Sequence, residues 1–465
     1  MHDNSKKLIK YQDLDNLDYS TVKKLYKKHI NNTRTDLLSC FGSGRVLVKK
    51  ALGSKIYLLN KKIILDATGG FGVLNHGHNH PRILKSRMYC LQNQTMEVNK
   101  SFLSPALAAL SSNLATLLPK KLNYSFFPNS GSEAIDVALR LALKFFNGRR
   151  DIFLASDIAF HGKSIGPQSI SRSGENPFKL DTAIKCHHFA YNSISSFDQL
   201  IKKNIKPNGE SKIAAVIIEP FSASTITEAT DKFLNHIFNV CNEQKILLIF
   251  DEVYSGFFKT GTFFNFLRLK NISPDILCFA KSLGGGKSSI AGVAYSDKLN
   301  DKTLSGINSA NYLSSTYYGF FEETVTALES IQIAIDEDYE SKAEIFHDYM
   351  SELSKDINNK FPNKFILKGK GLLWGLFIHE SNLPIGFSKS NFAKKIIYSS
   401  IINWLFEKKQ ILTALGFGYN PHIIISLNFA YSKNDLEKLK NAIYQVCEEN
   451  PIKLIPRFMK NMLWK

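Results

Sequence analysis

The sequence has few cysteines, a shortage of acidic residues and no long apolar segment. Its 465 residues include six cysteines, scattered without paired spacing, which argues against a disulfide framework or a zinc site. No apolar run approaches the ~20 residues that a membrane helix needs, and the N-terminus, rich in Asp, Asn and Lys, has no signal-peptide apolar region. We therefore expect reduced cysteines and a cytoplasmic protein.

The shortage of acidic residues leaves a strongly basic chain. Asp and Glu total 41 against 59 Lys and Arg, a formal net charge of +18. Such a balance often accompanies nucleic-acid binding. Here the basic residues are spread along the chain in pairs, without an aromatic-interleaved stripe, so we expect no nucleic-acid partner and consider an acidic protein the better candidate. The length and a hydrophobic content of 44% are sufficient for two domains with a large core.

Two short apolar runs each end at a side chain with acid–base chemistry. The run ILLIF (246–250) precedes Asp251, and ILCFA (276–280) precedes Lys281 and a triple glycine. Both runs are typical of strands buried on two faces, and ligands of an open parallel sheet lie outside the carboxyl ends of its strands. A converging amine and carboxylate suit pyridoxal phosphate (PLP): the amine forms a Schiff base with the aldehyde, and the carboxylate keeps the ring nitrogen protonated.

A second signal lies in residues 128–146, PNSGSEAIDVALRLALKFF. Its apolar residues recur at helical spacing, with Ser130, Gly131 and Ser132 at the helix start and Glu133 in the first turn. Free backbone N–H groups and the positive end of the helix dipole make such a start a phosphate site.

The motifs DEVYSGFFKTG, PDILCFAKSLGGG and SGSEA, with the segment DATGGFGVLNHGHNHPRI, resemble those of the class III PLP-dependent aminotransferases, the ornithine and ω-amino-acid transaminase family. The resemblance spans roughly residues 40–445. It implies an α/β protein of the fold-type-I PLP transferases, with a large, doubly wound, mostly parallel sheet domain and a smaller α+β domain. We expect an N-terminal arm and part of the small domain in 1–68, the large PLP-binding domain in 69–324 and the C-terminal small domain in 325–465.

By this resemblance, Lys281 is the Schiff-base lysine and Asp251 the partner of the ring nitrogen. The other matched positions surround the cofactor or the substrate: Gly131 and Ser132 at the phosphate, Phe160 with His161 on one face of the ring and Val253 on the other, Tyr254 at the phenolic oxygen, Glu219 near the ring, and Tyr57 and Phe71 in the substrate pocket. Thr316 matches a threonine that reaches the phosphate bound by the neighbouring subunit. The resemblance therefore implies a homodimer with shared active sites.

The chain departs from the family where many members bind a substrate carboxylate. The matching stretch 420–430 contains no arginine, and Ser224 occupies the position of the glutamate that pairs with that arginine. Their joint loss is coherent, because a buried glutamate without its partner carries a desolvation cost of several kcal/mol. The usual pose of 2-oxoglutarate or an α-amino acid is therefore in doubt. Tyr254 replaces a glutamine of the family, and its phenol can donate the same hydrogen bond.

The sequence thus predicts a PLP-dependent aminotransferase that moves an amine between an amine or amino-acid donor and an oxo-acid or aldehyde acceptor. Two alternatives stay open: another PLP reaction on this fold, catalysed by a decarboxylase, racemase or lyase, and a non-catalytic protein, against which Lys281, Asp251 and the phosphate helix argue. The substrate is either a free diamine or ω-amine, recognised by its apolar body, or a chain tethered to an acidic carrier protein.

His76, His78 and His80 alternate, so we considered a metal site. No Cys, Asp or Glu lies nearby in the sequence to complete a ligand shell, and Pro81 suggests a helix start directly after them. We therefore expect structural histidines and no metal.

Three further segments have local patterns. Residues 19–30 have helical spacing, and residues 46–65 contain two strand-like runs separated by polar residues, typical of a β-hairpin. The tail 451–465 mixes apolar and basic residues. Its two prolines argue against an amphipathic helix, and we expect a packed terminal extension.

Overall fold

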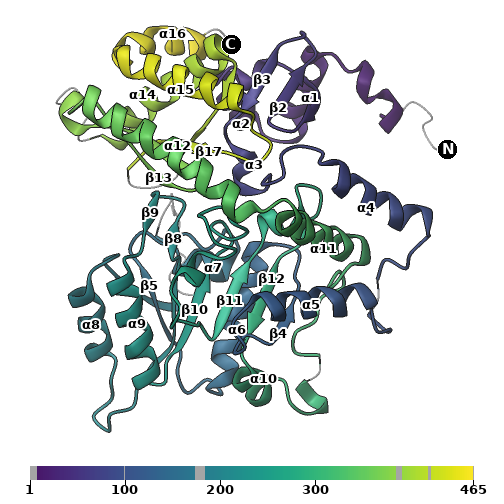
Figure 1. The fold of residues 1–465 in the computed structure, drawn as a ribbon, viewed down its shortest axis with the longest axis vertical. Coiled ribbons are helices and arrows are strands. Elements are labelled where there is room, and N and C mark those ends of the chain that lie inside the picture. The colour runs from purple at the N-terminus through teal and green to yellow at the C-terminus, as the bar shows by residue number, and fades with distance from the viewer. Residues whose placement is uncertain are drawn as a thin grey trace.

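The structure is a computed structural model that describes residues 8–98, 100–172, 184–309, 311–383, 390–416 and 420–463. The chain forms two bodies that lie one above the other along the long axis (Figure 1). The lower body contains a seven-stranded sheet and the upper body two four-stranded sheets, counted over the residues described. In the same residues, no helix is both long and apolar enough to span a bilayer.

The seven-stranded sheet has the strand order β4-β12-β11-β10-β7-β5-β6. The strands from β11 to β6 are parallel to one another, and β12 is antiparallel to its neighbours β11 and β4. Their bounds are β4 Tyr124–Phe126, β5 Ile152–Ser156, β6 Lys185–Phe189, β7 Ile213–Ile218, β10 Leu247–Asp251, β11 Ile276–Phe279 and β12 Gly292–Tyr295. The predicted α/β fold with a large, mostly parallel sheet is confirmed.

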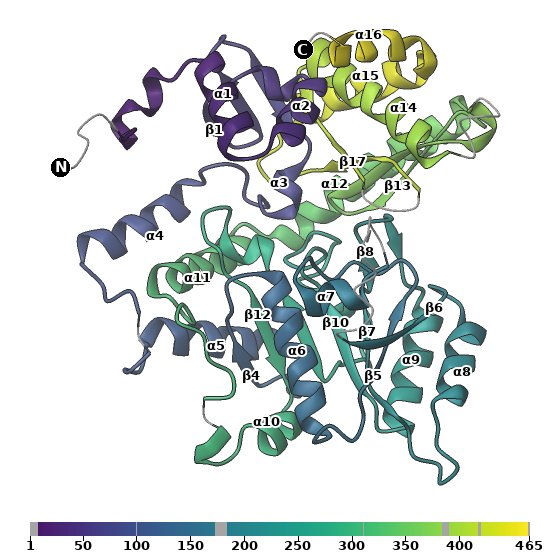
Figure 2. The same cartoon turned by 180° about the vertical axis from the view of Figure 1, so that it is seen from behind.

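Both faces of this sheet are buried, because strand residues point alternately to two cores. In β10, Leu248 and Phe250 join one core, and Leu247 and Ile249 join the other. Helices cover the two faces, as the opposite views of Figures 1 and 2 show. The first face carries α5 Pro105–Leu117, α8 Ile194–Lys203, α9 Asp231–Glu243 and α11 Phe321–Asp336, and the second carries α6 Gly131–Phe145, α7 Ile165–Ile170 and α10 Asp297–Thr303.

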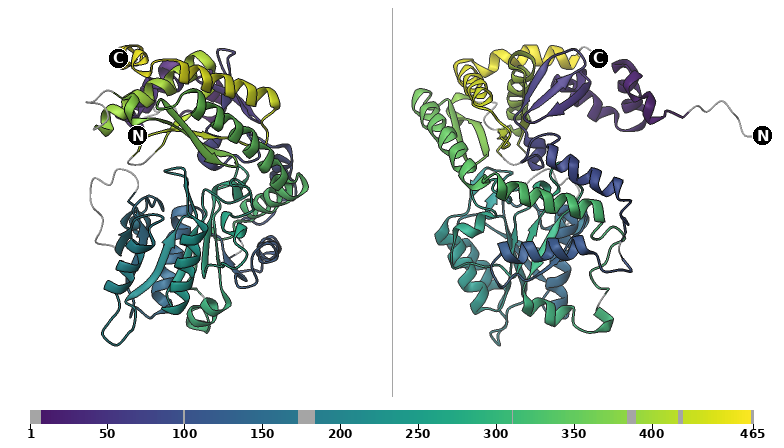
Figure 3. Two further views of the ribbon diagram at one scale, coloured as in Figure 1. Left: turned by 60° about the vertical axis from the view of Figure 1, so that its left-hand side comes forward. Right: turned by 45° about the vertical axis from the view of Figure 1, so that its right-hand side comes forward.

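The upper body combines segments from both ends of the chain. Its sheets have the orders β1-β2-β3-β15 and β13-β14-β17-β16, and β15 pairs with β3 in parallel. The strands are β1 Val48–Leu52, β2 Lys55–Leu58, β3 Ile63–Asp66, β13 Phe365–Lys370, β14 Leu373–Ile378, β15 Ile411–Leu412, β16 Ala414–Leu415 and β17 Ile423–Ser426. The helices are α1 Tyr19–His29, α2 Asn32–Cys40, α12 Tyr339–Lys360, α14 Asn391–Trp404, α15 Lys433–Glu448 and α16 Pro451–Leu463. Figure 3 shows the N-terminal strands, in dark blue and purple, beside the yellow C-terminal helices, although they come from opposite ends of the chain.

Two small elements lie between the bodies. The hairpin of β8 Phe221–Ser222 and β9 Thr227–Glu228 rises from the lower sheet toward β13 (Figure 1). The short helix α3 Gly69–Gly72 and the helix α4 Pro81–Gln92 connect β3 to the lower body.

Most local predictions are confirmed. The strands β2 and β3 form the expected antiparallel hairpin, and α1 begins after Asp18, whose carboxylate accepts a hydrogen bond from the Thr21 N–H at 2.7 Å. The helix α4 begins at Pro81, where the missing N–H costs nothing.

One local prediction was wrong. The tail forms the helix α16 although Pro456 lies inside it. Pro451 occupies the first turn, where proline is tolerated, and the buried Phe458 packs against the Phe41 ring with centroids 6.2 Å apart. Packing of the apolar face therefore outweighs the helix-breaking tendency of Pro456. The expected packed terminal extension is confirmed.

Candidate active site

The acidic residue and the lysine predicted at two strand ends lie at the same edge of the large sheet. β10 ends at Asp251, and its parallel neighbour β11 ends two residues before Lys281. The register places Asp251 opposite Cys278. The two side chains therefore leave adjacent strands at their carboxyl ends, where parallel sheets bind ligands.

Lys281 begins a tight 3-10 turn, Lys281–Gly284, and has a left-handed φ of 51°. For a residue other than glycine this conformation costs on the order of 1 kcal/mol and persists only where the surroundings hold it. Ser282 provides two such contacts: its hydroxyl donates to the Gly72 carbonyl at 2.9 Å, and its carbonyl accepts from the Ser330 hydroxyl at 2.9 Å. The turn is therefore fixed to both α3 and α11.

The Lys281 amine faces an aromatic ring. Its Nζ lies 3.6 Å from the centroid of the Tyr254 ring, and among the described residues it makes no hydrogen bond or ion pair. Burial lowers the pKa of Lys281 from 10.5 to about 8, although the carboxyl groups of Asp251 and Glu219 act in the opposite direction. At neutral pH about a tenth of such amines are unprotonated, far more than for an ordinary lysine. The amine is therefore prepared to react as a nucleophile.

Asp251 is held by two donors. Its Oδ2 lies 2.7 Å from Nδ1 of His161, and its Oδ1 accepts from the Val253 N–H at 3.0 Å. The His161 ring is fully buried, and within the described residues its Nε2 has no hydrogen-bond partner. The backbone N–H of His161 donates to the Ser171 hydroxyl at 2.8 Å. His161 thus orients the Asp251 carboxylate from behind.

Glu219, just past the end of β7, is a second buried carboxyl group at this edge. Its Oε2 accepts a hydrogen bond from the Phe160 N–H at 3.0 Å. Burial raises the pKa of Glu219 well above its usual range, and the nearby charge of Asp251 raises it further. Two close carboxylates in a buried site repel each other, which disfavours the ionised form of Glu219. This raised pKa favours the uncharged form of Glu219.

The start of α6 lies against the end of β10. Ser130 caps the helix, accepting a hydrogen bond from the Glu133 N–H at 3.2 Å. The N–H groups of Gly131 and Ser132 belong to the first turn, which has no helical acceptors for them. A Cβ on Gly131 would lie 2.8 Å from Cγ1 of Val253, so only glycine lets the helix start approach this closely. The arrangement suits an anion bound at the helix N-terminus.

Lys259 is a buried residue of this region that the sequence reasoning missed. It is 1% exposed, donates to Oδ1 of Asn75, and its Nζ lies 5.7 Å from the centroid of the same Tyr254 ring that Lys281 contacts. Burial lowers the pKa of Lys259 to about 7, and the positive charge of Lys281 contributes. Fully buried lysines are rare unless they are paired. The available signal was its place directly after two phenylalanines within DEVYSGFFKTG.

The wall beside Tyr254 is apolar. Tyr254 packs against the apolar cluster, which consists of Phe221, Ala223, Ile226, Leu373, Phe377, Ala414 and Ile424. Burial raises the pKa of Tyr254 to about 12, although the nearby Ser426 hydroxyl opposes this, and the phenol has no hydrogen-bond partner within the described residues. Ser224, adjacent to this cluster, bonds to the Ser222 hydroxyl at 3.2 Å. The positions that hold the carboxylate-binding arginine and glutamate in the family therefore lie in or beside an apolar cluster in this chain.

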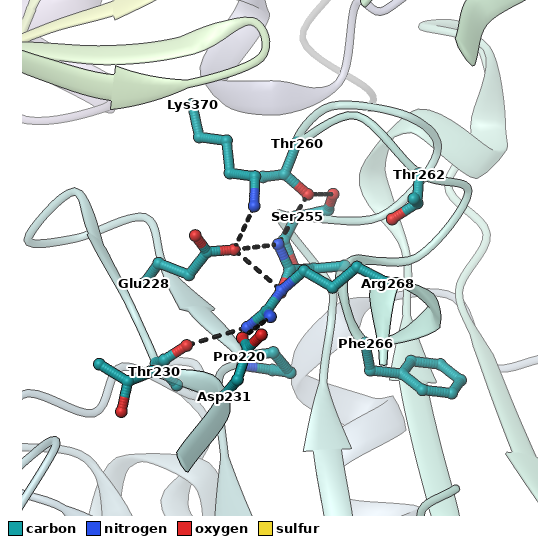
Figure 4. Close-up of polar contacts among 12 residues, drawn as sticks. Pro220, Glu228, Thr230, Asp231, Ser255, Thr260, Thr262, Phe266, Arg268 and Lys370 are labelled. Atoms are coloured by element: carbon teal, nitrogen blue, oxygen red, sulfur yellow. Dashed lines mark hydrogen bonds and ion pairs between the residues drawn. The ribbon is translucent and has the colours of Figure 1, made fainter. Parts of the chain in front are cut away.

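Arg268 belongs to a polar network outside this apolar cluster. Its Nε lies 3.1 Å from Oε1 of Glu228, and its NH1 contacts Asp231. The same Glu228 oxygen lies 2.6 Å from Nζ of Lys370 in β13 and accepts from the Asn265 amide at 3.0 Å. Figure 4 shows Glu228 between the two cations. Arg268 and Glu228 thus hold the β8–β9 hairpin against the upper body. The Arg268 guanidinium is already paired with Glu228 and Asp231.

Three expected site residues, Tyr57, Phe71 and Thr316, make no hydrogen bond or ring contact with Lys281 among the described residues. Tyr57, in β2, has the Lys50 amine 5.2 Å from its ring centroid. Phe71 has a φ of 58° and is 53% exposed, although the adjacent Gly72 lies against the Tyr254 ring. Thr316 is exposed on a loop.

The three alternating histidines have separate partners. His76 lies between the hydroxyls of Tyr339 and Ser330, each at 2.7 Å. The Nε2 atoms of the other two face carboxylates: His78 lies 2.9 Å from Asp66, and His80 lies 3.3 Å from Glu337. Among the described residues, no group of three His, Cys, Asp or Glu side chains could hold a metal ion. Each ring has a structural partner of its own.

Comparisons with known proteins give a consistent result. The family model described as aminotransferase class-III matches residues 42–396. A transaminase from the marine bacterium Virgibacillus is 21% identical, with a TM-score of 0.80 over 93% of this chain and 100% of the other. Ornithine aminotransferase from Toxoplasma gondii is 18% identical, with a TM-score of 0.76 over 94% and 97%. A PLP-bound amine transaminase from an uncultivated Pseudomonas species is 21% identical, with a TM-score of 0.73 over 86% and 94%.

Proposed function

The chain belongs to the class III aminotransferase family and is a PLP-dependent transaminase, and from this premise we propose which of its residues carry the reaction. The observation that carries the proposal is the convergence of two strand ends, with the Lys281 amine against Tyr254 and the Asp251 carboxylate held by His161. The family match gives no support to a decarboxylase, racemase or lyase.

The residues at this edge fit PLP. The amine of Lys281 has no acceptor among the described residues, which suits a group that bonds to an aldehyde carbon. The first-turn N–H groups of α6 have no helical acceptors and are available to a phosphate, and the absence of a Cβ on Gly131 lets this helix start lie against Val253. The Asp251 carboxylate, at the same edge of the sheet, is oriented by His161. We therefore assign Gly131 and Ser132 to the phosphate, Asp251 to the ring nitrogen and Lys281 to the aldehyde carbon.

Other residues complete the proposed pocket. We assign the side chains of Phe160 and Val253 to the two faces of the ring, where flat and branched groups can pack. The backbone N–H groups of these residues bond to Glu219 and Asp251, which places both residues at this edge of the sheet. His161 acts through Asp251, since its Nδ1 bonds to that carboxylate. Tyr254 has an unpaired phenol suited to donate to an anionic oxygen of the cofactor. Glu219, in its protonated form, can donate a hydrogen bond near the ring.

PLP, when bound, supplies an electron sink for the carbon that gives up its proton. The chain's own contribution is acid–base chemistry and orientation. With PLP bound, Lys281 would be released from the aldehyde carbon by the incoming amine. Its free amine would then take the proton from the substrate carbon and deliver it to the former aldehyde carbon, on the other side of the shared nitrogen. Its lowered pKa, about 8, allows both directions near neutral pH. Asp251 would keep a proton on the ring nitrogen of the bound cofactor, and the ring of Tyr254 keeps the Lys281 amine in place.

The substrates are an amine or amino acid and an oxo acid, as in the family. We favour a free amine whose carbon body packs on the apolar cluster next to Tyr254. The cluster buries alkyl groups well but offers no charge to a carboxylate. Tyr57 and Phe71 are further candidates for the substrate side of the pocket.

We also propose a homodimer with shared active sites and the domain division 1–68, 69–324 and 325–465. Thr316 is exposed on a loop, and we assign it to the cofactor phosphate bound by the neighbouring subunit. Large apolar side chains are exposed next to Thr316 in the sequence and in the segment before α5: Tyr317 is 57%, Leu103 99% and Phe102 67% exposed. Exposed apolar side chains of this size suggest an interface. The pairing of β15 with β3 supports a small domain built from both ends of the chain.

A second candidate substrate is a chain carried by an acidic protein. The helix α1 carries Lys23, Lys24, Lys27 and Lys28, which line a surface hollow of about 600 Å³. A patch of this charge would steer an acidic partner by long-range attraction. The six free cysteines, five of them buried, support a reducing, cytoplasmic location for such an encounter.

Salt separates the two candidates. Turnover of a carrier-bound substrate should fall steeply between low and about 0.5 M salt, because screening weakens steering, while the free acid is turned over poorly. Efficient, salt-insensitive turnover of a free diamine such as putrescine would reject the carrier.

Borohydride reduction tests the proposed lysine. Reduction of the PLP-loaded protein should fix the cofactor irreversibly to one lysine, because hydride converts the carbon–nitrogen double bond into a stable single bond. We expect peptide mapping to find the label on Lys281 and not on the nearby Lys259. A label on Lys259, or on an exposed lysine, would refute the assignment.

A further inference from the structure

His76 belongs to a buried hydrogen-bonded chain that ends beside Lys281. The ring is 4% exposed and has both nitrogens paired, Nδ1 with the Tyr339 hydroxyl and Nε2 with the Ser330 hydroxyl, each at 2.7 Å. Burial lowers the pKa of His76 to about 3, and neighbouring positive charges, first His80, contribute. The imidazole is therefore neutral, with a single N–H.

The direction of each hydrogen bond follows from the number of protons. The Ser330 hydroxyl donates its proton to the Ser282 carbonyl at 2.9 Å, so its oxygen can only accept from His76. Nε2 of His76 must then carry the hydrogen, and Nδ1 must accept from the Tyr339 hydroxyl. The bonds thus run one way, from Tyr339 through His76 and Ser330 to Ser282.

This series of hydrogen bonds connects three separate elements to the turn of Lys281. Tyr339 is the first residue of α12, 1% exposed, and its ring centroid lies 3.8 Å from that of Phe429. His76 lies between α3 and α4, and Ser330 lies in α11. Ser282 directly follows Lys281, whose left-handed φ of 51° needs support from its surroundings.

We propose that Tyr339, His76 and Ser330 are positioning residues that hold the Lys281 turn in its left-handed conformation and so aim the amine. The inference rests on the role proposed above for Lys281. Without the Ser330 hydroxyl, the Ser282 carbonyl loses its contact with α11, and the turn can relax toward an ordinary φ. The amine then moves relative to Asp251 and Tyr254, which changes both its reactivity and its surroundings.

Ser330→Ala tests the last link. We expect kcat to fall about 10-fold to 100-fold with KM changed less than about twofold, since misplacement of about 1 Å at a reacting group has effects of this size. The pH titration of visible absorbance in the PLP-loaded full-length variant should shift, because the environment of the lysine–cofactor linkage changes. Ser330→Thr keeps a hydroxyl and should restore part of both values.

His76→Gln and His76→Leu test the middle link and give a matched pair. Glutamine can donate to Ser330 through its amide N–H and accept from Tyr339 through its carbonyl, whereas leucine can do neither. We expect Gln to keep kcat within about threefold of the wild type and Leu to reproduce the Ser330→Ala loss. His80→Gln is the control, because His80 faces Glu337 and takes no part in this series of hydrogen bonds.

The outcomes separate the possibilities. Unchanged kcat and unchanged spectral titration in both Ser330→Ala and His76→Leu would overturn the proposal. A loss of activity equal in the Gln and Leu variants, with a matching fall in Tm, would assign these residues to stability alone and would also overturn it. If borohydride fails to label Lys281 in the wild-type protein, the proposed function fails first, so the two failures are distinguishable.

Discussion

Lys281→Ala should abolish transamination, with kcat at least about ten-thousandfold lower, because one side chain supplies both the covalent attachment and the acid–base group. The methyl group of alanine leaves the Tyr254 ring without its amine and has no proton to move. PLP should still bind through the start of α6, with the spectrum of the free aldehyde and not that of a lysine-bound form. Stopped-flow absorbance and steady-state turnover would measure both effects.

Lys287→Ala is the control for this variant. Lys287 lies six residues further along the chain, on the same loop after the triple glycine, but is exposed. We expect this substitution to change kcat less than about twofold, since surface changes away from special contacts have small effects. Equal losses in both variants, or substantial turnover by Lys281→Ala, would contradict the role of Lys281.

Much of this site could be predicted from short segments. The runs before Asp251 and Lys281 are apolar, short and β-branched, so their burial as parallel strands, and the shared edge of the two side chains, follow from the pattern alone. The start of α6 was equally visible, because Ser130 has the side chain that caps a helix and glycine follows it. The features of the site that depend only on the local spacing of residues could therefore be predicted.

The remaining contacts depend on which distant segments meet. Lys259 is paired with Asn75, and His76 with Ser330, and no periodicity in the sequence connects those positions. His161 was expected on the cofactor ring. In the structure its Nδ1 bonds to Asp251, because β5 and β10 bring their carboxyl ends to the same edge of the sheet. Such pairings are set by tertiary packing, which a single sequence does not specify.

The tail shows the opposite limit, where a local rule gave the wrong prediction. Pro456 disfavours a helix by ~3 kcal/mol in isolation. α16 nevertheless forms, because its apolar side chains, among them Phe458, pack on the α2 and α14 side of the upper body. Burial of one phenylalanine contributes ~2 kcal/mol, so a few such contacts outweigh one proline.

Asp251→Asn should lower kcat roughly a thousandfold, the scale seen when a site loses an oriented charge from its transition state. Asparagine fills the same space but is neutral, so the ring nitrogen of the cofactor would lose its proton. His161 would lose the carboxylate that its Nδ1 contacts at 2.7 Å. The decrease should appear in kcat and leave the attachment of PLP to Lys281 intact, as absorbance would show.

The same substitution should lower the pKa of the Lys281 amine, so that the amine reacts at lower pH although turnover falls. The Asp251 carboxylate stabilises the Lys281 ammonium and so raises its pKa; without that charge the pKa of Lys281 falls below about 8. The free amine is then present at lower pH, and its reaction with an acylating reagent in cofactor-free protein should begin at lower pH than in the wild type. Turnover falls while the unprotonated fraction of the amine at a given pH rises, a combination that general unfolding does not produce.

Glu219→Gln separates this charge effect from a change of shape. Burial, with the nearby charge of Asp251, raises the pKa of Glu219 well above its usual range, which favours its uncharged form. Replacing it with an amide should therefore shift the pH dependence of Lys281 acylation much less than Asp251→Asn does. An equal shift in both variants would mean that Glu219 is ionised beside Lys281. No shift in Asp251→Asn would remove Asp251 from the electrostatic environment of the amine.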